Sequence, residues 1–107
     1  MAGLKTADWD YELIAASQSV QVLGPTTGTT KTAGTQYLSH LVVVPETTSA
    51  GTVAIKDGAD TAINVFVTGT LPSTQSFVIP LRMKNMTGSW QVTTGAAVHV
   101  IAVGRFT

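Results

Sequence analysis

The sequence predicts an all-β fold of about eight antiparallel strands in a two-sheet sandwich of jelly-roll type. Apolar residues recur in short β-branched runs with a period near two, and Gly, Pro and an Asp-Gly pair separate these runs. No stretch of about 10–12 residues shows the 3.6-residue period and the caps of a helix. The Cys, Trp, Cys pattern of an immunoglobulin domain is absent, which favours the jelly roll. A length of 107 residues suits a single β-sandwich domain spanning 1–107.

The first half of the chain contains the more apolar of the expected strands. The run 36–44, QYLSHLVVV, is expected to be a central strand covered on both faces, and Pro45 ends it because proline cannot donate to a ladder. The polar turn from Asp57 to Asp60, which contains Gly58, predicts a hairpin. The strands expected here are 11–17, 19–23 (a second strand or a continuation of the first), 36–44, 52–56 and 62–67.

The second half of the chain contains three further expected strands, at 75–83, 89–93 and 96–106. Pro80 lies opposite an apolar face in the first of them, which indicates an edge strand. Trp90 and Phe106 lie in alternating runs and are expected in the core. In the closing strand, Val98, Val100 and Ala102 share one face, and His99, Ile101 and Val103 share the other.

Charge is scarce and evenly balanced. Six basic residues match six acidic ones, only 11% of positions are charged, and the mean hydropathy is +0.28. This balance gives no electrostatic footprint for nucleic acid or an anionic membrane. So weakly charged a surface fits either a soluble Thr-rich sandwich or, as we favour, one partly hidden against other subunits. All acids lie at or before Asp60 whereas Arg82, Lys84 and Arg105 follow it, which suggests head-to-tail complementarity between copies.

The residues offer no constellation for catalysis, cofactor binding or metal binding. The chain has no cysteine, and the glycines before Lys31 lack the spacing of a phosphate-binding loop. His40 and His99 lie within expected strands without metal-ligand spacing, so we expect structural or interface histidines. Asp57 and Asp60 are explained as turn formers. We therefore expect no enzyme, no cofactor, no metal site and no small-molecule substrate, and the lack of a long apolar run predicts no signal peptide and no membrane span.

Three segments resemble small β-sandwich virion proteins of tailed bacteriophages, of which capsid decoration (cement) proteins are the best understood. The segments are 37–66, YLSHLVVVPETTSAGTVAIKDGADTAINVF, then 77–81, FVIPL, and 89–106, SWQVTTGAAVHVIAVGRF. The resemblance implies a non-enzymatic protein on the outer capsid lattice, made in the host cytoplasm, which braces neighbouring major capsid protein subunits. It also implies a homo-oligomer, with a trimer favoured, as well as the major capsid protein as partner.

Two segments have no strand pattern and are candidates to order on such a partner. Residues 1–10 form a possible N-terminal arm, in which Trp9 either packs on its own domain or docks onto a neighbour. Residues 24–35, GPTTGTTKTAGT, are expected to form a flexible Thr/Gly-rich loop or an arm. The alternative function is a tail or fibre component that binds a host glycan on an aromatic platform. The predicted partner contacts are Trp9, Tyr11, Thr26, Thr29 and Lys31.

Overall fold

The computed structural model describes residues 10–24, 36–67, 70–71 and 73–106, and these form eight strands and no helix. The predicted all-β class is therefore confirmed. The strands are β1 (Asp10–Ile14), β2 (Gln21–Val22), β3 (Gln36–Pro45), β4 (Val53–Asp57), β5 (Ile63–Phe66), β6 (Phe77–Lys84), β7 (Trp90–Thr94) and β8 (Val98–Phe106).

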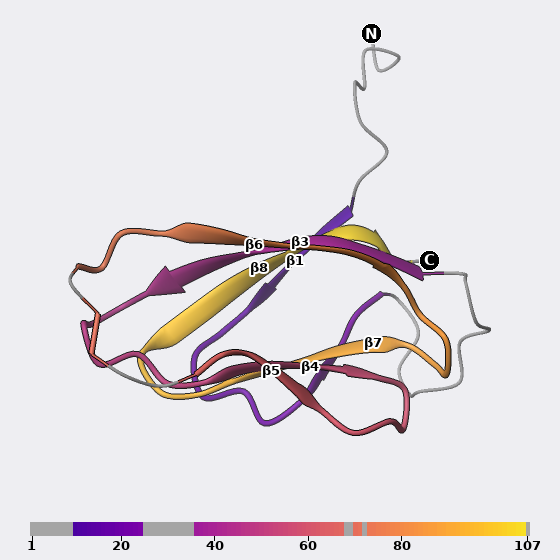
Figure 1. Cartoon of the computed structure of the whole chain (residues 1–107), viewed down its shortest axis with the longest axis horizontal. Coiled ribbons are helices and arrows are strands. Elements are labelled where there is room, and N and C mark those ends of the chain that lie inside the picture. The colour runs from indigo at the N-terminus through magenta and orange to yellow at the C-terminus, as the bar shows by residue number, and fades with distance from the viewer. Residues whose placement is uncertain (1–9, 25–35, 68–69, 72, 107) are drawn as a thin grey trace, which may run out of the picture.

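The strands make two four-stranded antiparallel sheets that pack face to face, β1-β8-β3-β6 and β2-β7-β4-β5 (Figure 1). Each strand of the first half pairs with one of the second half: β1 with β8, β2 with β7, β3 with β6 and β4 with β5. This is the pairing of one long antiparallel ribbon that is folded over on itself, and β3–β8 and β4–β7 pairs close the two sheets. The order is that of a jelly roll, as predicted.

The core lies between the sheets and is built from their inward-facing apolar side chains. Every second residue of β8 is buried, as the period of two requires. Trp90 and Phe106 are 3% and 2% exposed, so the prediction that both are core residues is confirmed. The largest fully buried apolar side chains are Ile14, Leu23, Leu38, Leu41, Ile55, Val43, Val53, Val92, Val98 and Val100.

The first two strands are shorter than predicted because the chain crosses from one sheet to the other between them. β1 ends at Ile14, and Ser17 takes a left-handed φ of 59° in the crossing turn. The turn is held by hydrogen bonds from the Ser17 N–H to the Gly95 carbonyl, 2.8 Å, and from the Thr94 N–H to the Gln18 carbonyl, 3.0 Å. Only Gln21–Val22 remain of the expected second strand.

Strand β3 is central in its sheet and β6 is at an edge, as predicted. The expectation that β3 is covered on both faces is wrong. Its residues alternate between buried, such as Leu41 and Val43, and half-buried, such as Val42 and Val44, because the second sheet covers only the inner face. A long apolar run can therefore mark a strand with one face against the core and one free face.

A bulge in β3 bends this sheet. The pairing register shifts between Leu38 and His40 against both neighbouring strands. Opposite the bulge lies Gly104, where an added Cβ would overlap the Tyr37 carbonyl oxygen. Glycine is thus the residue that lets the β3 and β8 backbones approach this closely.

Candidate functional site

The outer face of the β1-β8-β3-β6 sheet carries two rows of side chains that run across all four strands. Residues directly opposite in paired strands lie on the same face. One row is Leu13, Ile101, Val42 and Val78. The other is Tyr11, Val103, His40 and Pro80.

A third pair, Val44 with His99, extends these rows toward the end of the sheet where β3 ends. We call the surface made by the two rows and this pair the outer face. Its members are either apolar or histidine, and none is Asp, Glu, Lys or Arg. Three of them are well exposed: Tyr11 at 76%, Leu13 at 59% and Val78 at 56%. The outer face is therefore an apolar surface four strands wide.

The outward side chains of the second sheet are different. They include the row Asn64, Ala54 and Thr93 and the row Lys56, Gln91 and Val22, of which Ala54 and Gln91 are buried. Apart from Val22, these side chains are polar or small. The outward rows of the two sheets thus differ in chemistry, those of the first sheet being the more apolar.

No described strand packs over the apolar outer face (Figure 1). Isolated apolar residues on a protein surface need no explanation, but a contiguous patch of them marks an interaction site. Tyr11 lies in this patch, at an edge of the sheet. The other predicted contact residues, Trp9, Thr26, Thr29 and Lys31, lie outside the described residues, as do nearly all of the arm 1–10 and of the loop 24–35.

The two histidines share the outer face but do not contact each other through any described hydrogen bond. His40 Nδ1 lies 3.0 Å from Ser39 Oγ, and His99 Nδ1 lies 2.9 Å from Glu46 Oε2. Within the described residues, no group of three or more His, Asp or Glu side chains is arranged to hold a metal ion. Each histidine therefore has a local polar partner of its own.

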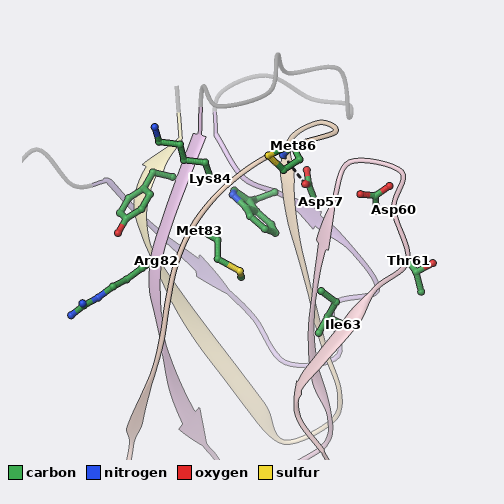
Figure 2. Close-up of a pocket in the computed structure, with 10 residues that line it drawn as sticks. Asp57, Asp60, Thr61, Ile63, Arg82, Met83, Lys84 and Met86 are labelled. Atoms are coloured by element: carbon green, nitrogen blue, oxygen red, sulfur yellow. Dashed lines mark hydrogen bonds between the residues drawn. The ribbon is translucent and has the colours of Figure 1, made fainter.

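A second candidate site is a groove of about 630 Å³ between the edge strands β5 and β6. In Figure 2, Met83 points into it, and Ile63, Thr61, Asp60 and Asp57 stand across from Met83. Arg82 and Lys84 extend away from the groove in the same view. Trp90 also lines the groove, and its buried indole Nε1 has no hydrogen-bond partner among the described residues.

The carboxylate of Asp57 is occupied by the backbone of the β6–β7 loop. It accepts hydrogen bonds from the N–H groups of Met86, 2.7 Å, Thr87, 3.0 Å, and Gly88, 3.1 Å. Asp60 Oδ2 accepts a further one from Thr87 Oγ1, 2.8 Å. The predicted turn is present, with a hydrogen bond of 3.0 Å from the Asp60 N–H to the Asp57 carbonyl.

The turn pattern in the sequence did not predict a further structural role of these carboxylates. They also connect the β4–β5 turn to the β6–β7 loop. The described residues that line the groove include no histidine, serine or cysteine.

Within the described residues there is also no helix long and apolar enough to cross a membrane. Comparisons of the chain with protein-family models, with curated proteins and with solved structures give no match. The outer face and the groove are therefore interpreted from their own chemistry.

Proposed function

We propose that this protein is a structural, non-enzymatic component of a bacteriophage particle, a decoration protein that binds the major capsid protein and copies of itself. The observation that carries the proposal is the apolar, uncharged outer face, over which no described strand packs. A face of this kind is stable in water only at a cost that burial against a partner removes. The jelly roll itself is common to viral capsid and lectin domains, so the fold alone does not select the function.

Decoration works by burying surface in many copies, and this fold suits that role. A rigid antiparallel sheet presents its apolar side chains in one layer, so docking orders few additional groups. A copy that lies across the boundary between two capsid subunits adds its buried area to both, and separating the subunits then requires that this area be exposed again. The proposed location is the outside of the capsid, after synthesis in the host cytoplasm.

The test uses particles made with and without this protein. Particles that lack it are expected to release their genome at a lower temperature, measured by dye access to DNA during heating. Adding the purified protein back is expected to restore the wild-type release temperature. Equal heat resistance of both particles, with no binding on add-back, would contradict the proposal.

The second candidate is a glycan-binding module of a tail or fibre. It is favoured by the exposed ring of Tyr11, 76% accessible on an edge strand, since sugars stack on exposed aromatic rings. This function predicts saturable binding to host glycans that Tyr11→Ala removes. Absence of any glycan binding, together with particle binding as above, would leave only the decoration role.

A further inference from the structure

The two edges of the β1-β8-β3-β6 sheet carry opposite charges. Strand β1, at one edge, contributes Asp10 and Glu12, and strand β6, at the other, contributes Arg82 and Lys84. The edge strands of the second sheet, β2 and β5, have no charged residue at all. The separation of charge is therefore a property of the same sheet that bears the apolar outer face.

The acids of the β1 edge are bound only by neutral donors among the described residues. Asp10 Oδ2 accepts a hydrogen bond from the Phe106 N–H, 3.0 Å, and Glu12 accepts bonds from the Gly24 N–H, 2.5 Å, and the Gln21 amide, 3.1 Å. These donors are neutral, and a carboxylate has further acceptor positions. Among the described residues, no cation forms an ion pair with either acid.

The basic residues of the β6 edge also lack an ion pair with any described residue. Arg82 and Lys84 are exposed, and neither forms an ion pair with a described residue. In Figure 2 both side chains extend away from the groove and from the acidic residues of the β4–β5 hairpin. Each edge therefore carries charge that no described residue of the same chain matches with an ion pair.

The strand directions and the pairing register show how two copies fit edge to edge. β1 is antiparallel to β8, β8 to β3 and β3 to β6, so β1 runs antiparallel to β6. A second copy set beside the first, with its rows at the same level, thus continues an antiparallel sheet. Leu13 of the second copy then lies next to Val78, and Tyr11 lies next to Pro80.

The same placement brings Asp10, but not Glu12, toward the basic end of β6, because Glu12 is level with Ile79. Both acids share rows with core-facing residues, whereas Arg82 and Lys84 are exposed on the other side of β6, so the charges approach each other across the edge. Asp10 lies in the row that ends at Met83, and Met83 is the neighbour of Lys84. Apolar side chains therefore meet apolar ones while the acidic end of β1 meets the basic end of β6. We propose that copies of this chain associate head to tail, with the β1 edge of one copy against the β6 edge of the next.

Pro80 limits this contact to side chains and short stretches of backbone. Proline has no N–H, and Arg82 has a left-handed φ of 55°, so an unbroken ladder cannot run along β6. A proline and a left-handed residue in an edge strand prevent further strands from adding to the sheet without limit. A head-to-tail contact of this kind closes into a ring when the rotation from one copy to the next divides a full turn evenly. Because the rows of neighbouring copies lie at the same level, their outer faces form one continuous surface.

This inference rests on the proposed function, because it assigns a surface to the self-association of a decoration protein. Purified protein alone tests it, so its outcome is separate from particle binding. The measurement is the weight-average mass against concentration, by light scattering and sedimentation, at low and at high salt. Wild type is expected to exceed the 11.1 kDa of one chain, with a dissociation constant that rises with salt because the pairs are exposed.

A double-mutant cycle locates the contact. Asp10→Asn with Glu12→Gln keeps the hydrogen-bond acceptors but removes the charges, and is expected to raise the dissociation constant about 3- to 25-fold. Arg82→Asn with Lys84→Gln is expected to do the same, since Asn tolerates the left-handed φ. If the edges meet, the combined variant is little weaker than either pair alone.

The matched control is Lys56→Gln, which removes one positive charge from the outer face of the second sheet and is expected to change nothing. A monomeric wild type at all concentrations would overturn the inference. So would an oligomer whose dissociation constant is insensitive to the edge charges, or one in which the two sets of changes are additive. Those last results would place the contact elsewhere on the sandwich.

Discussion

At the scale of single residues, the Asp57 carboxylate joins two loops that are far apart in the sequence. It holds three backbone N–H groups of the β6–β7 loop. Asp57→Ala leaves those donors to water and is expected to lower the free energy of unfolding by about 2 kcal/mol, because hydrogen bonds to a charged group contribute about 1.5–3 kcal/mol. Urea unfolding followed by Trp fluorescence measures the change.

Asp57→Asn and Asp60→Ala are the matched comparisons. Oδ1 of Asp57 accepts two of the three bonds, so an Asn oxygen can keep both and the expected loss is about half as large. Asp60 accepts its bond from an exposed hydroxyl, and its loss is expected to cost about 0.5 kcal/mol. Equal stability of all four proteins would show that the loop is not held by this carboxylate.

Gly104 is the second residue with a specific requirement. A methyl group there would collide with the Tyr37 carbonyl oxygen at the β3 bulge, and the two backbones cannot move apart without breaking the β3–β8 pairing. Gly104→Ala is therefore expected to destabilise the fold by about 3 kcal/mol. The control is Val103→Thr on the outer face of the same strand, expected within about 1 kcal/mol of wild type by the same urea assay. Similar values for the two variants would mean that the bulge relaxes freely.

At the scale of elements, one buried glutamine connects strands of both sheets. The Gln36 side chain donates to the Leu23 carbonyl, 3.0 Å, and accepts from the Trp90 N–H, 2.7 Å, while its backbone pairs with Asn85. β3 of one sheet is thereby joined to β7 of the other and to the residue after β2. A buried polar side chain with all of its main partners present is stable inside a core.

Gln36→Met tests this link with a side chain of similar length. It leaves a buried carbonyl and a buried N–H without partners, at about 1–3 kcal/mol each, so we expect a total loss of about 2–5 kcal/mol in urea unfolding. The control is Gln21→Met, whose amide donates to Glu12 and to the Leu13 carbonyl in more exposed positions, with an expected loss below about 1 kcal/mol. A Gln36→Met protein as stable as wild type would exclude this link as a source of stability.

The strands were largely predictable from the sequence because each leaves a local pattern. The alternation in 96–106 and the turn at Asp57 place β8 and the β4–β5 hairpin within one or two residues. The short β2 was not predictable in its length, because the residues around it are used by the crossing between sheets. The contacts of Gln36 leave no local pattern, since its partners lie up to 54 positions away.

The outer face was predictable only in part, and the reason is physical. The run around Val42 has apolar residues on both faces, which is typical of a strand covered twice, and the sequence does not tell a covering layer of the same chain from a partner. Tyr11 was a predicted contact residue. Leu13 and Val78 were missed because they join the outer face through pairings between strands remote in the sequence. No local pattern in the sequence marks either residue as part of a surface patch.

At the scale of the whole molecule, the two sheets differ in the side chains that they turn outward. The β2-β7-β4-β5 sheet has mainly polar or small outward side chains, and the β1-β8-β3-β6 sheet has the apolar outer face and charged edges. The two rows and the terminal pair that make up the outer face carry no charged side chain, and Arg82, Lys84 and Arg105 lie beyond them on the same side of the sheet.

The outer face can be weakened for binding with little change to folding. Val42 and Ile101 are neighbours in one row and half-buried in the single chain, so Val42→Thr with Ile101→Thr leaves both hydroxyls in contact with water. A bound partner would strip that water away at about 1 kcal/mol or more for each hydroxyl. We expect binding to capsids that lack the protein to weaken roughly 30-fold, with the free energy of unfolding reduced by no more than about 2 kcal/mol.

Binding is measured by co-sedimentation of labelled protein with such capsids. The control is Asn64→Ser on the outer face of the second sheet, which is exposed and expected to bind like wild type. If the Thr variant binds normally while the control does not, the polar sheet faces the capsid. The apolar outer face would then be buried between copies, and the variant would show its defect in the mass of the purified protein instead.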